Sequence, residues 1–116
     1  MSIISYAQER NCSDFKTGQF KYVDERLKEI ITRTDSMQIE INPDNQAEIH
    51  TTIEWVSECE YVLTYTKIIN WPENVSDVIG RKIYCTIMET KGNWVKVYTK
   101  GVSADGPVEL IKIDNQ

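Results

Sequence analysis

The sequence predicts an all-β domain, an antiparallel meander of about eight short strands that forms a closed or half-open barrel or a sandwich. Apolar and polar residues alternate with a period of two in several segments, and a turn sequence follows almost every one of them. At most one short helical turn is expected. No internal repeat and no apolar run long enough to span a bilayer interrupts this pattern.

Three strands are expected before the central hairpin. The first alternates enough to bring Phe20 and Tyr22 to one face, and the second holds three consecutive β-branched residues, which favour a strand over a helix. A two-residue turn at Asp35 and Ser36 precedes the third strand. Residues 42–45 form the next turn, because proline sets φ and the Asn and Asp side chains can bond local backbone. These strands cover residues 19–23, 28–34 and 37–41.

The central hairpin is expected over residues 47–69. Its two strands carry their bulky side chains at odd positions, so a loop with an odd number of residues pairs Trp55 with Tyr61 and keeps the bulky faces together. A two-residue loop would mix the faces. The sequence therefore predicts an odd loop, of three residues at 57–59 or of five, with Cys59 in the turn rather than in the ladder.

A second hairpin is expected over residues 81–100, after a single helical turn at 75–79, and a last strand over 107–113. A two-residue loop at Gly92 and Asn93 sets which residues of the two strands share a face. One face then holds Ile83, Cys85, Ile87, Trp94 and Tyr98. The other face is apolar as well, so the hairpin must be covered on both sides by other strands, by a loop or by a partner.

The charge of the chain disfavours two classes of partner. Thirteen basic residues stand against 18 acidic ones, which gives a net charge of −5 and a sequence pI near 4.9. Nucleic acids and anionic membranes are bound by clustered Lys and Arg, and no such cluster is present. We therefore expect neither partner.

The three cysteines lack the spacing of zinc ligands. Cys85 lies in an apolar strand pattern and is expected to be a small buried residue. Cys12 and Cys59 lie at segment ends. In an exported protein they would form a disulfide that stabilises the fold by roughly 3–4 kcal/mol, whereas in a reducing cytosol both would remain thiols.

The predicted organisation is a flexible N-terminus at residues 1–11, a single β-domain at 12–113 and a polar tail at 114–116. Ser5-Tyr6-Ala7 followed by Gln8 has the small-x-small form that precedes a signal-peptide cleavage site. Residues 1–7 are thus either the remainder of an export signal or an ordinary frayed N-terminus.

No motif of the sequence predicts catalysis. The single histidine, His50, has no nucleophile or orienting carboxylate at a recognisable spacing, and no calcium loop or dinucleotide fingerprint is present. We therefore expect no enzyme, no catalytic residue, no metal site and no cofactor. Aromatic residues remain as candidates for holding a small hydrophobic or aromatic ligand in a barrel, or else for filling a closed core. The candidates are Trp55, Tyr61, Tyr65, Trp94 and Tyr98.

Two segments resemble a known group of proteins. Residues 12–20 have the form C-x-D-F-x-x-G-x-F, and residues 55–61 have the form W-x-x-x-C-x-Y. Both are similar to segments of small exported bacterial proteins of unknown function, and the resemblance spans roughly residues 12–113. It implies a periplasmic or cell-envelope location rather than a cytoplasmic one. It also supports the Cys12–Cys59 pairing, and it brings no known catalytic residues.

A fainter similarity is to lipocalin-like barrels, whose first strand carries G-x-W. Here Gly18-Gln19-Phe20 replaces that motif, and the last strand has Lys112 where arginine is more usual. Together these observations predict a non-enzymatic cell-envelope β-domain that binds a small hydrophobic ligand. The alternative is a protein-interaction or structural module that uses the apolar hairpin 81–100.

Overall fold

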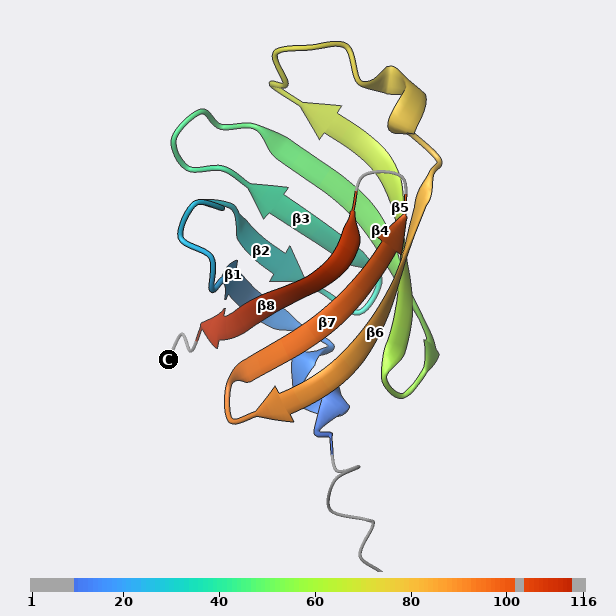
Figure 1. Ribbon diagram of the computed structural model, residues 1–116. Helices are drawn as coiled ribbons and strands as arrows, with labels where there is room; N and C mark the ends of the chain where they lie inside the picture. The colour runs from blue at the N-terminus through green and yellow to red at the C-terminus, as the bar shows by residue number, and fades with distance from the viewer. Residues whose placement is uncertain (1–9, 102–103, 114–116) are drawn as a thin grey trace, which may run out of the picture.

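The computed structural model describes residues 10–101 and 104–113, in which eight antiparallel strands close into a barrel (Figure 1). Each strand pairs with the next in sequence, and β1 pairs with β8 to complete the closure. The predicted all-β meander is confirmed, in its closed-barrel form. The strands are β1 Gly18–Tyr22, β2 Ile30–Arg33, β3 Met37–Ile41, β4 Glu48–Ser57, β5 Glu60–Ile69, β6 Lys82–Lys91, β7 Trp94–Gly101 and β8 Asp105–Ile113.

Two short 3-10 turns accompany the strands of the described chain. The turn η3, Ser76–Val78, lies where the sequence predicts a helical turn at 75–79. The turn η2, Cys12–Phe15, lies in a segment that reads only as polar and turn-rich. The predicted export stub at 1–7 and the tail at 114–116 lie outside the described residues.

The central hairpin has the predicted pairing but not the predicted loop. Trp55 lies opposite Tyr61, and the bulky faces of β4 and β5 match. The turn itself contains two residues, Glu58 and Cys59, so the expectation of an odd loop is wrong. A bulge at Val56 adds one unpaired residue beside the turn and restores the matching of faces. As predicted, Cys59 lies in the turn.

The second hairpin has the predicted turn but a different distribution of faces. Its two-residue loop at 92–93 and the pairing of Glu89 with Lys96 are confirmed. A bulge between Ile87 and Glu89 then shifts the alternation by one residue, so that Val95 and Val97 face the interior. The prediction that Trp94 and Tyr98 share a face with Ile83, Cys85 and Ile87 is therefore wrong. Both lie on the outer surface of β7, and Tyr98 is 44% exposed.

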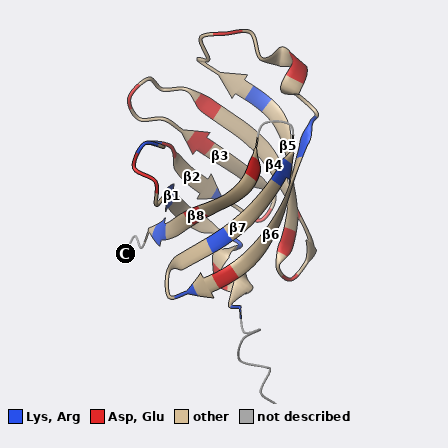
Figure 2. Cartoon of the chain, in the orientation of Figure 1, with Lys and Arg blue, Asp and Glu red and all other residues tan. Residues whose placement is uncertain are grey.

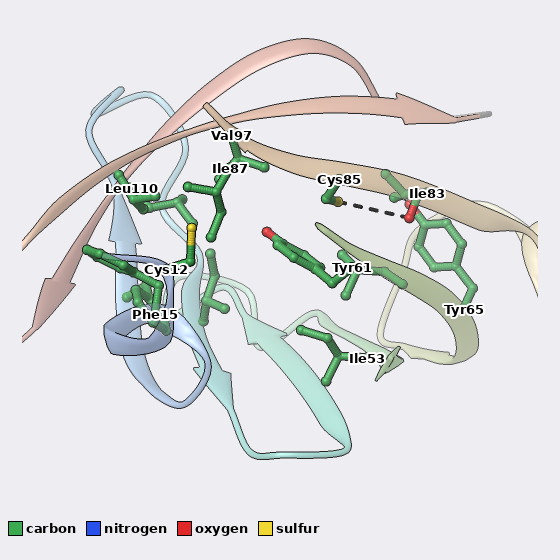
Figure 3. Packing of buried hydrophobic residues seen from close by; sticks show 14 residues of the cluster. Cys12, Phe15, Ile53, Tyr61, Tyr65, Ile83, Cys85, Ile87, Val97 and Leu110 are labelled. Atoms are coloured by element: carbon green, nitrogen blue, oxygen red, sulfur yellow. Dashed lines mark hydrogen bonds between the residues drawn. The ribbon is translucent and has the colours of Figure 1, made fainter. Parts of the chain in front are cut away.

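The N-terminal segment covers one end of the barrel (Figure 1). Phe15 of η2 is 1% exposed and packs 6.2 Å from the ring of Phe20, in the same core cluster as Ile87 and Leu110 (Figure 3). The predicted disulfide between Cys12 and Cys59 joins η2 to the β4–β5 turn. We call this covered end the floor of the barrel. Cys85 is a free, buried cysteine, as predicted.

A lysine from the last strand also holds the floor in place. Lys112 of β8 donates a hydrogen bond from Nζ to the Asp14 carbonyl oxygen at 2.6 Å. Its side chain passes over Gly18, where φ is +123° and an added Cβ would lie only 2.8 Å from the lysine Cε. Glycine at this position therefore leaves room for the Lys112 side chain to reach the backbone of η2.

Charges of both signs are distributed over the outside of the barrel. Figure 2 shows basic and acidic residues side by side on β6, β7 and β8. Lys96 lies between Glu89 and Glu109 on neighbouring strands, and Lys100 pairs with Asp105. This outer surface therefore offers alternating charges rather than a basic patch.

Candidate functional site

The barrel interior contains a cavity of about 200 Å³. Its lining comes from all eight strands and combines apolar side chains with a group of polar ones. The lining residues are Tyr22, Ile31, Arg33, Gln38, Glu40, Ile49, Thr51, Tyr61, Leu63, Tyr65, Ile83, Cys85, Thr99, Ala104, Val108 and Leu110. The interior of this barrel is thus not completely filled by its own side chains.

The strand β3 presents its polar face to this cavity. Gln38 and Glu40 point inward, and Gln38 is 3% exposed. On the opposite face of the same strand, Met37 and Ile41 lie on the outside and are 38% and 37% exposed. This orientation is the reverse of what an apolar-inward alternation would give, and it places an amide and a carboxyl group inside the barrel.

Arg33 of β2 stands beside these two residues, near the floor, and is 4% exposed. Its Nε and Nη2 donate to Gln38 Oε1 at 3.0 and 2.8 Å, and its Nη1 donates to the Phe15 carbonyl oxygen at 2.8 Å. The guanidinium also lies 5.0 Å from the Phe20 ring centre and 4.8 Å from that of Tyr61. Neutral acceptors and two aromatic faces thus replace the water around this charge.

Glu40 continues the polar chain away from the floor. One of its carboxyl oxygens accepts a hydrogen bond from Tyr22 Oη at 2.8 Å, and the other accepts one from Gln38 Nε2 at 3.3 Å. Burial raises the pKa of Glu40, and the negative charge of Glu29 raises it further, against the opposing effects of the Tyr22 hydrogen bond and the Arg33 charge. Burial also raises the pKa of Tyr22 well above its usual value.

The deep end of the cavity holds two further groups of low acidity. Burial raises the pKa of Tyr61 to about 12 and that of Cys85 to about 11. The Cys85 thiol is therefore a poor nucleophile at neutral pH. Figure 3 shows the Tyr61 hydroxyl directed into the space between Cys85, Ile87 and the floor.

The structure separates the five aromatic residues that the sequence offers as ligand contacts. Tyr61 and Tyr65 line the cavity. Trp55 lies below them, with its ring centre 4.6 Å from that of Tyr61 and the Lys16 ammonium 4.9 Å above it. Its buried Nε1 has no hydrogen-bond partner within the part of the chain that the structure describes.

The remaining two aromatic candidates have no access to the cavity. Trp94 donates a hydrogen bond from Nε1 to Glu109 Oε1 at 3.0 Å on the outer surface. Tyr98 lies between Thr86 and Pro107 on the same surface. The structure thus brings together only part of the predicted set.

The inward position of the polar residues could have been inferred from the pairing register. The apolar alternation of β3 points to the opposite face. A two-residue turn at Asp35 and Ser36 pairs Arg33 with Gln38, which puts both on one face. Phe20 pairs with Ile31, two residues before Arg33, and so shares that face. If Phe20 is taken as an inward residue, the pairings with β2 and then β3 predict that the polar face of β3 also points inward.

A second, mainly apolar pocket adjoins the cavity on the side away from the floor. It has a volume of about 260 Å³ and lies under the β5–β6 loop that contains η3. Ile49 and Tyr65 line both spaces. The pocket is completed by Ile68, Trp71, Val75 and Val78. Two side chains thus form the boundary between the cavity and this pocket.

His50 lies on the outside of β4, where its Nε2 is 2.8 Å from Glu48 Oε1. Within residues 10–101 and 104–113, no group of three or more His, Cys, Asp or Glu side chains is arranged to hold a metal ion. In the same ranges no helix is long and apolar enough to cross a membrane.

No protein-family model, no curated protein and no solved structure matches this chain.

Proposed function

We propose that this protein is a non-enzymatic binding module of the cell envelope that holds a small hydrophobic or aromatic ligand inside its barrel. The observation that carries the proposal is the cavity of about 200 Å³ between Tyr61, Tyr65 and the apolar side chains of β5, β6 and β8. An apolar cavity of about 150 Å³ is enough to bind benzene. The size therefore fits a compound with a single ring.

The disulfide supports the proposed location. Cys12 and Cys59 are bonded in the structure, and disulfides of this kind persist in oxidising compartments such as the periplasm. The resemblance of residues 12–20 and 55–61 to small exported bacterial proteins points the same way. The proposal of export rests on these two observations.

Ligand titrations test the binding proposal directly. We expect toluene, indole and benzyl alcohol to raise the melting temperature and to change tryptophan fluorescence, because Trp55 and Trp71 lie beside the cavity and the adjoining pocket. A saturated fatty acid serves as a longer apolar comparison. Absence of any response to all four compounds would refute ligand binding in the barrel.

A pair of adjacent substitutions locates the binding site. Leu63 lines the cavity, whereas Val62 points to the outside of the same strand. We expect Leu63→Trp to fill the cavity and abolish binding, and Val62→Trp to leave it unchanged. Leu63→Phe is the smaller enlargement to use where Leu63→Trp does not fold. Equal binding by the Leu63 and Val62 variants would place the ligand elsewhere.

A second candidate function is protein interaction through the outside of the hairpin 81–100. Three large side chains on this surface are unusually exposed, Tyr84 at 55%, Met88 at 52% and Tyr98 at 44%. If they form a contact between copies, light scattering will show association that Tyr84→Ser/Tyr98→Ser removes. A wild-type protein that stays monomeric at high concentration would remove self-association from consideration.

A further inference from the structure

The cavity has two chemically different walls. One wall consists of polar side chains from β1, β2 and β3, namely Tyr22, Arg33, Gln38 and Glu40. A second wall, from β5, β6 and β8, is mainly apolar and includes Leu63, Ile83, Val108 and Leu110. It adjoins the polar wall where Leu110 pairs with Tyr22. A ligand that fits between them needs a polar edge and an apolar edge.

The hydrogen bonds of the polar wall leave part of the acceptor capacity of Glu40 unused. All three guanidinium nitrogens of Arg33 donate to acceptors of the protein itself. Nε and Nη2 donate to Gln38 Oε1, Nη1 donates to the Phe15 carbonyl oxygen, and Nη2 also donates to Tyr61 Oη. Each oxygen of Glu40 accepts one hydrogen bond, although an ionised carboxylate accepts about four in total. Glu40 can therefore accept about two more hydrogen bonds from a ligand.

The charges around Glu40 select against an anion at this place. Glu29 lies close enough to Glu40 for its negative charge to act on the carboxyl group. A carboxylate ligand bonded to this part of the wall would meet both negative charges in a poorly solvated space. The opposing charge of Arg33 is stacked between the rings of Phe20 and Tyr61 and already bonded to the protein.

Given the proposed ligand binding, we infer that the ligand has one ring and presents a hydrogen-bond donor, an amine, amidine or amide N–H, to Glu40. The free acceptors of Glu40 bind the donor, and the apolar wall packs against the ring. The cavity selects this class over carboxylates of equal size. The inference deepens the proposed function by assigning Glu40 as the residue that determines specificity.

Three compounds of nearly equal size test the selection. Benzylamine carries a cationic donor, benzyl alcohol a neutral hydroxyl and benzoate an anionic acceptor. Calorimetric titration of the full chain at pH 7 is expected to give the affinity order benzylamine, benzyl alcohol, benzoate, with at least a tenfold difference between the first and the last. Benzoate binding as tightly as benzylamine would overturn the inference and leave the proposed binding function standing. Failure of all three compounds to bind would instead contradict the proposed function itself.

Glu40→Gln tests the residue assignment, with Glu54→Gln as the matched control on the exposed outer face of β4. We expect Glu40→Gln to lower the ratio of benzylamine to benzoate affinity at least tenfold, and Glu54→Gln to leave the ratio unchanged. An unchanged ratio in Glu40→Gln would overturn the role of Glu40. Should that variant not fold, wild-type protein with ¹³C-labelled glutamate carboxyl groups gives a second test. Benzylamine must shift the Glu40 resonance, and its failure to do so at saturation would also refute the inference.

Discussion

A buried guanidinium is stable only where acceptors and aromatic faces replace its water, and Arg33 has both. Its three acceptors belong to η2, β3 and β5, so this one side chain links the floor to the barrel wall. Replacing it would leave the Phe15 carbonyl oxygen and Gln38 Oε1 without their donors. The residue therefore contributes to stability as well as to the polarity of the cavity.

We predict that Arg33→Met lowers the free energy of unfolding by about 2–4 kcal/mol, because buried acceptors lose their partners. Urea unfolding followed by circular dichroism measures the change. Arg26→Met, at an exposed arginine bonded to Asp24 in a surface turn, is the control and should leave the unfolding midpoint in place. A loss below about 0.5 kcal/mol in Arg33→Met would contradict the structural role assigned to this residue.

Glu40 makes stability depend on pH in a defined direction. Burial raises its pKa in the folded state above that in the unfolded chain, so the folded protein holds this proton to a higher pH. Unfolding then releases a proton in the interval between the two pKa values, and the Glu40 contribution to stability falls as pH rises through that interval. The loss of stability caused by ionising the buried Glu40 carboxyl is absent at a pH below the ordinary carboxyl pKa. It reaches its full size at a pH above the raised pKa.

We therefore predict that Glu40→Gln gains stability relative to wild type as pH rises from 4 to 8. Urea unfolding of both proteins at several pH values gives the difference in unfolding free energy, and the same comparison for Glu54→Gln supplies the baseline. A Glu40→Gln difference that stays constant over this range would show that the Glu40 pKa is not raised.

The N-terminal segment is bonded to the barrel by residues that are distant from it in sequence. Cys12 is bonded to Cys59, 47 positions further on, and Lys112 is bonded to Asp14. Asn11 and Arg10 donate hydrogen bonds to Thr90 and to the Ile87 carbonyl oxygen of β6. The floor is therefore part of the tertiary structure and not a separate appendage.

We predict that Cys12→Ala/Cys59→Ala lowers the free energy of unfolding by about 4 kcal/mol, the value that chain entropy gives for closing a loop of this length. Thermal and urea unfolding measure the change. Reduction of the wild-type protein should reproduce it, and the same reductant should leave the double variant unaffected. An unchanged midpoint after verified reduction would show that the other contacts hold the floor without the disulfide.

In β3 and β7 the face that points inward differs from the one that the apolar alternation predicts. In β7 the alternation is intact, but the bulge between Ile87 and Glu89 changes which of its faces points inward. In β3 the apolar residues Met37 and Ile41 lie outside because Gln38 is held opposite Arg33. In both strands a contact with the neighbouring strand, rather than the strand's own pattern, decides the orientation.

The pairing of β1 with β8 closes the sheet and removes both of its free edges. The pairing connects Gln19–Tyr22 with residues 110–113, so the two strands nearest the ends of the described chain protect each other. Both strands also contribute side chains to the cavity wall. Closure of the barrel is therefore a condition for the proposed binding site.

We predict that backbone amides bonded between β1 and β8 exchange with solvent as slowly as those between β4 and β5, because a closed barrel opens as one cooperative unit. Hydrogen exchange followed by NMR measures this residue by residue. Amides of the exposed β5–β6 loop serve as the fast-exchanging reference. Rapid exchange confined to the β1–β8 seam would indicate a sheet that opens at this seam.

The strands, the approximate places of the turns and the burial of Cys85 could be predicted from the sequence, since these depend on alternation and turn residues within a few positions. The sequence also indicated the pairing of Trp55 with Tyr61, because two bulky faces in one hairpin must match. The outward position of Trp94 and Tyr98 comes from a bulge that the alternation of β7 does not encode, and the inward position of Gln38 and Glu40 follows from the pairing of β3 with β2. A strand's own alternation defines two faces, but bulges, the pairing with neighbouring strands and the closure of β1 on β8 decide which face points inward.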